Sequence, residues 1–328
     1  MEPIEPEHIN NSEPQENVNF EERPSILPKP ILIQDKKNWV RKSLISLAIY
    51  GFLFYFVFGG NFAYIAAVLV VLLIHEFGHF FAMKAFNYSN VKLFVLPLLG
   101  AYVTGQKSVI SQRQMSIIIL AGPLPGMIIG FCLLMYTVLF PSERLHMLGN
   151  IFFFLNLFNL LPFIPLDGGR LLETLFAKHN HTIRVVFTII SIAAMALLAI
   201  VAHSVIFLII PVSMIFDLIM EIKNQKIREY LDQEQINYTT DYADLPDSSY
   251  WTIRDCILLS FNKRYAGIQA GVHQYSALEG GIIQHVVAIL KTPFIKDVQV
   301  LEKIGIIFIY IIFLIVLPLI YLLIYLFT

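Results

Sequence analysis

Residues 71–83 read VLLIHEFGHFFAM, a stretch that places two histidines and a glutamate inside an otherwise apolar run. Residues four apart share one face of a helix, so His75 and His79 would present two imidazoles to a single ion. Glu76 lies next to them, close enough to reach a water on that ion, which completes the HExxH pattern of two ligands and a general base. An ionisable group at the centre of a membrane span costs about 2.5–3.5 kcal/mol. Metal binding would offset that cost.

Composition predicts that lipid is part of the solvent of this chain. Of its 328 residues, 57% are hydrophobic and 14% are charged, whereas soluble domains have about 45–50% apolar and about 25% charged residues. The net charge of −1 gives no basic footprint for nucleic acid, so we expect no such partner. The two cysteines, one in an apolar run and one in a polar region, give no sign of a disulfide or of an oxidising compartment.

The apolar runs predict an all-α polytopic membrane protein with about seven transmembrane helices, several of which approach the roughly 20 residues that cross a bilayer. We expect a disordered cytoplasmic tail at 1–42, a transmembrane catalytic core at 43–220, a cytoplasmic region at 221–303 and a C-terminal transmembrane helix at 304–327. The predicted spans are 43–60, 61–86, 114–140, 147–166, 184–201, 203–220 and 304–327.

The placement of lysine and arginine predicts the orientation. With the N-terminus in the cytoplasm, the outside loops carry only Arg144, and the other basic residues fall on the cytoplasmic side. This distribution follows the positive-inside bias. The resulting topology puts His79 and Asp167 toward the cytoplasmic ends of their spans, so we expect an integral multi-pass protein with its site facing the cytoplasm. The membrane would be the plasma membrane if the chain is bacterial.

Asp167 is the best candidate for a third protein ligand, which a catalytic zinc needs besides one open position. It lies in NLFNLLPFIPLDGGR (156–170), after a long apolar run and before two glycines. Pro162 and Pro165 would break the helix near its end, and broken backbone at membrane depth is tolerated where it lines a wet cavity. We therefore expect one Zn²⁺ per chain, held by two histidines and this carboxylate.

Residues 92–106, KLFVLPLLGAYVTGQ, are apolar but too short to span and are interrupted by Pro97 and Gly100. We interpret them as two short strands that form a small re-entrant β-hairpin near the site. An unpaired strand edge accepts an extended peptide as an added strand, which a transmembrane substrate must become before cleavage. The candidate substrate-binding residues are Leu98, Gly100, Ala101 and Tyr102.

The motifs HEFGH (75–79) and FNLLPFIPLDGG (158–169), with AGPLPG (121–126) between them, resemble the site-2 protease family of intramembrane zinc metalloproteases. The resemblance covers about residues 61–170. It implies His75, His79 and Asp167 as zinc ligands, Glu76 as catalytic base and a catalytic role for Asn159. The side-chain amide of Asn159 could donate a hydrogen bond to the oxyanion that forms during cleavage. The resemblance also agrees with a β element beside the site. Ile164 stands where the family often has a proline, which leaves the local kink open. The small residues of AGPLPG would allow close helix packing.

The resemblance implies an intramembrane endopeptidase that cleaves a transmembrane segment of a membrane-protein substrate, with 221–303 as a candidate region for substrate or regulator binding. Two alternatives stay open. One is a membrane metallopeptidase that acts on soluble or lipidated peptides and takes its third ligand from a downstream glutamate, of which Glu173 is the nearest. The other is a non-catalytic zinc-binding scaffold or carrier.

Overall fold

The computed structural model describes residues 27–32, 41, 45, 61–96, 100–177, 180–203 and 208–327. The predicted span 43–60 lies almost wholly outside these residues, as does Leu98. Within the described part, four helical stretches are long and apolar enough to cross a membrane. They are Phe62–Ala85, Gln112–Leu139, His181–Val201 and Val300–Phe327.

The helix order follows the apolar runs closely, and the ends of the runs are set by local chemistry. Asn61 caps the first helix by accepting a hydrogen bond from Tyr64 N–H, and Asn180 caps another by accepting from Ile183 N–H. The helices that follow the apolar runs are α2 (Phe62–Ala85), α3 (Gln112–Ala121), α4 (Pro123–Leu139), α5 (Glu143–Asn159), α7 (His181–Val201), α8 (Ile209–Gln233), α11 (Val300–Ile311) and, after a π-helical turn η3 (Ile312–Val316), α12 (Leu317–Phe327).

The predicted count of about seven spans is only partly met in the described residues. The predicted span 114–140 is two helices, α3 and α4, that meet at Gly122. The predicted span 147–166 corresponds to α5, which has 17 residues and ends at Asn159. The predicted span 203–220 corresponds to α8, whose second half carries the charged sequence EIKNQKIREYLDQ and runs on past residue 220. Length and charge therefore keep α5 and α8 out of the four candidate spans.

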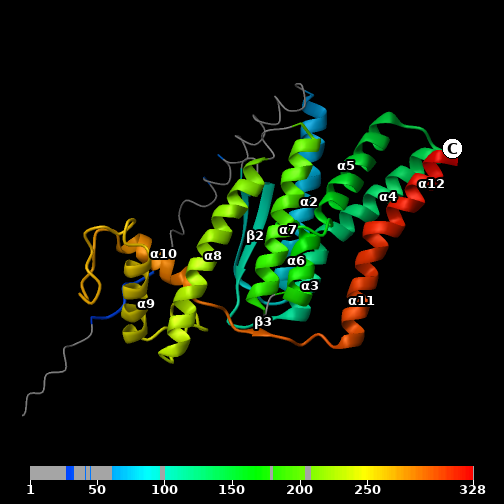
Figure 1. The fold of residues 1–328 in the computed structure, drawn as a ribbon. Helices are drawn as coiled ribbons and strands as arrows, with labels where there is room; N and C mark the ends of the chain where they lie inside the picture. The colour runs from blue at the N-terminus through cyan, green and yellow to red at the C-terminus, as the bar shows by residue number, and fades with distance from the viewer. Residues whose placement is uncertain are drawn as a thin grey trace, which may run out of the picture.

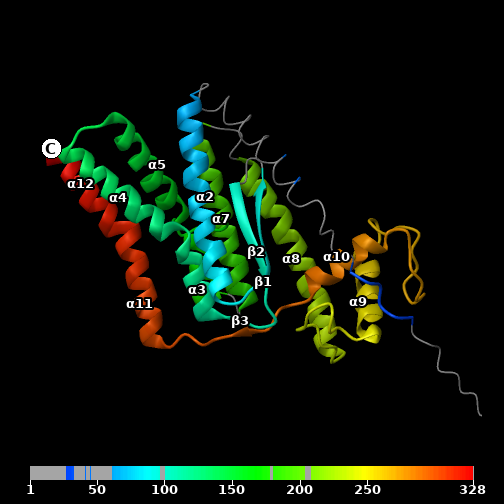
Figure 2. The ribbon, with the colours of Figure 1, turned by 180° about the vertical axis from the view of Figure 1, so that it is seen from behind.

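The predicted hairpin is present. Strand β1 (Ser89–Leu96) pairs antiparallel with β2 (Gly100–Gln106), with Leu96 opposite Gly100 and Phe94 opposite Tyr102. Both strands lie beside α2, as both views show (Figures 1 and 2). A second pairing was not predicted: the two-residue strands β3 (Ile110–Ser111) and β4 (Phe294–Ile295) pair in parallel.

The membrane core surrounds α2, which packs against α3, α4 and α5. The C-terminal helices α11 and α12 lie against α4 at one flank of the molecule (Figure 1). Tyr310 of α11 is buried and donates a hydrogen bond to Leu160 O at 2.8 Å, directly after α5. The short helix α6 (Asp167–Leu172) and the π-helical turn η1 (Glu173–Ala177) follow and pack against α3.

Residues 221–290, which we call the α8–α10 module, have a hydrophobic core of their own. The end of α8 packs there with α9 (Asp247–Ser260) and α10 (Glu279–Ile289), and Trp251, Ile257 and Ile282 are almost fully buried. The module lies at the far end of α8, on the opposite flank from α11 and α12 (Figures 1 and 2).

The tail was expected to be disordered as far as residue 42. Of these residues the structure describes 27–32 and 41, and Leu32 packs against the core of the α8–α10 module.

Candidate metal centre

Helix α2 places the two histidines of the HEFGH motif on its buried face. His75 is 3% exposed and His79 is 7% exposed. Their Nε2 atoms lie 3.2 Å apart. Val68 and Val71, two turns and one turn before His75, are buried as well, in contact with α5 residues. The face that carries the histidines is therefore the face that the helix turns toward the protein.

Asp167 begins α6 and reaches the same point from the other side. Its Oδ2 atom lies 3.0 Å from His75 Nε2 and 3.2 Å from His79 Nε2. The two glycines after Asp167 allow the backbone to pack closely against the preceding loop. A Cβ on Gly168 would lie 2.0 Å from Leu160 O, and one on Gly169 would lie 2.2 Å from the carbonyl carbon of Phe163, so a larger residue would clash at either position. The Gly-Gly pair thus lets the chain fold tightly back after Pro165 and bring the carboxylate to α2.

The three side chains fit a tetrahedral divalent metal. Their ligand atoms all lie within 4.8 Å of one another, and all three residues are buried. Ligands about 2.0–2.1 Å from a tetrahedral zinc are separated by about 3.3 Å, which is close to the separations of 3.0 and 3.2 Å found here.

Hydrogen bonds at the Nδ1 atoms of His75 and His79 fix the tautomer and the orientation of each imidazole ring. His79 Nδ1 lies 2.8 Å from Ile118 O, a carbonyl that only accepts, so Nδ1 carries the proton. His75 Nδ1 lies 2.8 Å from Asn156 Oδ1. The Asn156 amide nitrogen donates to Phe152 O at 2.7 Å, so the oxygen must face the ring. Both Nε2 lone pairs consequently point at the shared site, as metal ligation requires.

Glu76 completes the centre as a buried carboxylate. It is 5% exposed, and its Oε2 atom has no hydrogen-bond partner among the described residues. Buried carboxylate oxygens are nearly always paired, so an unpaired one beside a metal-ligand cluster is suited to handling a water molecule or a substrate. The guanidinium of Arg170 lies 3.6 Å from the second oxygen of Asp167 and faces the outer side of that carboxylate.

Two other residues considered from the sequence lie elsewhere. The Asn159 amide donates to Leu155 O of its own helix at 3.1 Å, so an oxyanion role would need a different rotamer and stays a prediction. Glu173, the alternative third ligand, pairs with Arg184 at 2.8 Å. Sequence reasoning missed Asn156, which is fully buried and orients His75. The one feature of the sequence that could have indicated Asn156 is its polar side chain in an apolar run, three residues before Asn159.

Of the candidate substrate-binding residues, three lie at the start of β2, where Gly100, Ala101 and Tyr102 pair with the end of β1. Strand β2 packs along α2, the helix that carries the histidines. In the described residues this sheet has two strands, so each strand keeps one unpaired edge. Their role in substrate binding stays a prediction.

Comparison with known proteins finds a family match over the part of the chain that holds the metal-ligand cluster. Residues 63–144 and 139–202 match the sequence profile of peptidase family M50. This part of the chain is similar to that family, in agreement with the resemblance to site-2 proteases.

Two curated relatives and one solved structure are similar to parts of the chain. Zinc metalloprotease MJ0392 of Methanocaldococcus jannaschii is 32% identical over 122 residues, 34% of this chain and 35% of the relative. Stage IV sporulation protein FB of Bacillus subtilis is 32% identical over 123 residues, 36% of this chain and 42% of the relative. The structure titled site-2 protease from Methanocaldococcus jannaschii shares 23% identity and a TM-score of 0.40, covering 54% of this chain and 86% of that one. The chain thus spans well under half the length of the curated relatives it matches.

Proposed function

We propose that this protein is a membrane-embedded zinc endopeptidase that cleaves a transmembrane segment of a protein substrate. The observation that carries the proposal is the convergence of His75, His79 and Asp167 in a buried cluster, with two of the three on a helix that is apolar enough to span a membrane. The M50 match and the name of the first relative, a zinc metalloprotease, support zinc as the metal.

Zinc in such a site supplies the Lewis acidity that makes water nucleophilic near neutral pH. Glu76 would accept the proton of the attacking water and hand it to the leaving amide nitrogen. Asn159, in a second rotamer, would donate to the oxyanion. The burial of all three ligands excludes bulk water, so the polar groups act in a medium where their electrostatic effect is strong.

The substrate must present an extended backbone, because a helix hides its carbonyls in its own hydrogen bonds. The hairpin beside α2 supports binding by strand addition, with residues 98–102 as the receiving segment. The bias of basic residues supports a cytoplasmic site, and the α8–α10 module would lie on that side as a region for substrate or regulator recognition.

Glu76→Gln tests the function directly. The variant should keep stoichiometric zinc, because Glu76 is not a ligand, and should lose about 10²–10⁴-fold in cleavage rate, the usual contribution of a general base. Mass spectrometry of membrane-protein fragments in cells with wild type or variant measures the loss, and elemental analysis measures the zinc. Normal processing by Glu76→Gln would support a carrier or scaffold instead.

The alternative with a soluble or lipidated peptide substrate takes Glu173 as the third ligand. The pairing of Glu173 with Arg184 favours Asp167 as that ligand instead. Replacing Asp167 and Glu173 separately by alanine distinguishes the two ligand sets. Zinc should be lost with Asp167→Ala and kept with Glu173→Ala; the reverse pattern would reject the proposed ligands.

A further inference from the structure

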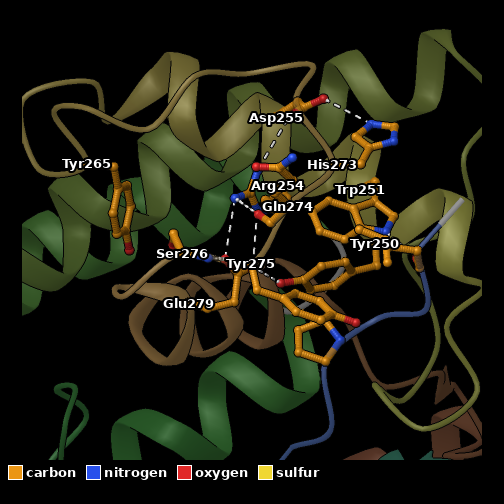
Figure 3. A network of polar contacts seen from close by, with 12 residues as sticks. Tyr250, Trp251, Arg254, Asp255, Tyr265, His273, Gln274, Tyr275, Ser276 and Glu279 are labelled. Atoms are coloured by element: carbon orange, nitrogen blue, oxygen red, sulfur yellow. Dashed lines mark hydrogen bonds and ion pairs between the residues drawn. The ribbon is translucent and has the colours of Figure 1, made fainter.

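Residues 27–32, Leu-Pro-Lys-Pro-Ile-Leu, lie along one face of the α8–α10 module although more than 200 positions separate them in the sequence. We call residues 27–32 the N-terminal strap. Figure 3 shows Tyr250, Trp251 and Tyr275 beside this segment, which is drawn in blue. Nothing in the protease chemistry uses this contact, so it calls for an explanation of its own.

The module recognises the backbone of the strap with side chains. Prolines have no N–H to donate, so the strap offers mainly carbonyl acceptors, and aromatic donors meet them. Three carbonyls accept from the module: Leu27 O from Trp251 Nε1 at 2.6 Å, Pro28 O from Tyr275 Oη at 2.5 Å and Pro30 O from Tyr242 Oη at 2.7 Å.

Lys29 is the specific contact of the strap. Its ammonium group donates to the carbonyl oxygens of Tyr242 at 2.8 Å and Ala243 at 2.7 Å, and to that of Leu245. An ammonium has three protons to donate, so this carbonyl cage uses all of them. The same nitrogen lies 5.4 Å from the Tyr242 ring centre, within cation–π range. The Lys29 N–H donates to Asp247 Oδ1 at 2.9 Å.

The receiving face is built into the core of the module. Arg254 is fully buried, pairs with Glu279 at 3.0 Å and donates to Gln274 O at 2.9 Å. Glu279 also accepts from Ser276 N–H at 3.0 Å. Burial alone would raise the pKa of Glu279, but hydrogen bonds from Arg254 and the neighbouring Tyr250 hold it below its usual value. The network (Figure 3) fixes residues 272–276.

That fixed loop forms one wall of the site. His273 and Tyr275 both stack on Trp251, with ring centres at 5.0 and 5.9 Å and interplanar angles of 24° and 22°. A row of aromatic rings with outward donors is what recognises extended, proline-rich peptides in general. The contacts that hold residues 274–276, from the buried Arg254 and its partner Glu279, involve no residue of the strap.

The two prolines of the strap restrict its backbone before it binds. Each proline fixes its own φ near −65°, and the residue before each proline is restricted to extended conformations. Residues 27–30 are therefore all biased toward extended conformations. Such a segment loses little conformational entropy on binding.

We propose that the face formed by Tyr242, Asp247, Trp251 and Tyr275 is a recognition site for extended peptides that carry lysine between two prolines. Its occupant is the strap of the same chain. Because the strap belongs to the same chain, its binding to the face is intramolecular. A second peptide of the same chemistry would have to displace it. The strap thus acts as an intramolecular ligand that ties the N-terminal tail to the module.

Peptide binding to the full chain in detergent micelles tests the site. The probe is a fluorescent peptide of residues 25–34, SILPKPILIQ, followed by anisotropy. A variant that lacks residues 1–33 should bind it at least tenfold more tightly than wild type, whose own strap competes. The same peptide with Lys29→Met should bind the truncated variant at least tenfold more weakly. Equal binding by wild type and the truncated variant, or by the two peptides, would overturn the proposal.

A second measurement keeps the chain at full length. The protein has two tryptophans, Trp39 and Trp251, so a Trp39→Phe background leaves Trp251 as the only reporter. In that background Lys29→Met should shift the emission of Trp251 to longer wavelength and increase its quenching by acrylamide. Lys263→Met, which removes an exposed lysine from the same module, should change neither. Emission and quenching unaltered by Lys29→Met would contradict the strap as ligand.

Discussion

Asn156 shows what a single side chain contributes to the metal centre. Its carboxamide bridges α5 to the His75 ring. The oxygen Oδ1 lies 2.8 Å from His75 Nδ1, and the nitrogen Nδ2 donates to Phe152 O at 2.7 Å. The HExxH spacing predicted both histidines from the sequence, because four-residue spacing on a helix is local geometry. The orienting residue was not predictable in this way. Which polar residue of a span faces α2 depends on the rotation of α5, and packing sets that rotation.

The orienting role of Asn156 predicts a loss of metal affinity. Asn156→Ala frees the His75 ring to rotate and should weaken zinc binding about 10–100-fold, the usual cost of removing such a partner. Competition with a chelator, followed by elemental analysis, measures the change.

Asn159→Ala is the matched control on the same helix. It should keep normal zinc affinity, because the one hydrogen bond of the Asn159 amide within the described part of the chain goes to Leu155 O, away from the metal ligands. If it also loses cleavage, the predicted oxyanion role is supported. Equal zinc affinity in Asn156→Ala and Asn159→Ala would contradict the role given to Asn156.

Close helix packing positions α2 against the junction of α3 and α4. A Cβ on Gly78 would lie 2.0 Å from Ala121 O, and one on Gly122 would lie 2.3 Å from His79 Nε2. The small residues of AGPLPG predicted such an approach from the sequence. Hydropathy predicted a single span at 114–140, and the structure divides it at Gly122, directly before Pro123, a residue that is favoured at the first position of a helix. The hairpin was predicted from its short length and from the interruptions at Pro97 and Gly100.

Gly122→Ala should disturb the site through sterics alone. Gly122 has φ −72° and ψ −65°, which alanine adopts without strain, so any effect comes from the methyl group against the His79 ring. Overpacking of this kind costs about 1–3 kcal/mol, and the displaced ring should lower zinc content.

Gly305→Ala provides the comparison, since nothing lies within 4 Å of a Cβ at that position in α11. It should retain zinc and be neutral or slightly stabilising, by at most about 1 kcal/mol. Thermal unfolding measures the stability of both variants, and elemental analysis measures their zinc content. Full zinc occupancy in Gly122→Ala would show that the contact with His79 is loose.

At the scale of the whole molecule, contacts between distant segments decide the arrangement. The strap meets residues 242–275 across more than 200 positions, and β3 pairs with β4 across more than 180. Neither contact follows from hydropathy or periodicity, which are local properties. Low hydrophobicity predicted a disordered tail, but for residues 27–32 the deciding features were two prolines and a lysine that match a distant surface.

A cluster of charges joins the membrane core to the α8–α10 module. Glu221 of α8 accepts from Arg184 of α7 at 3.1 Å and from Arg228 at 2.9 Å. Arg184 also pairs with Glu173 at 2.8 Å, six residues after Asp167. Arg228 is buried and holds the end of α10 through Ile289 O at 2.9 Å. One carboxylate therefore links the segment after the metal ligand to the base of the module.

Glu221→Gln should weaken this joint. The neutral amide keeps the shape but leaves the buried Arg228 without its anionic partner, and losing such a partner costs about 1–3 kcal/mol. We expect a lower unfolding temperature from Trp251 fluorescence and unchanged zinc content, because no metal ligand is touched. Glu229→Gln, an exposed position on the same helix, removes the same charge and should stay within about 0.5 kcal/mol of wild type. If both variants unfold at the same temperature, Glu221 does not hold the module to the core.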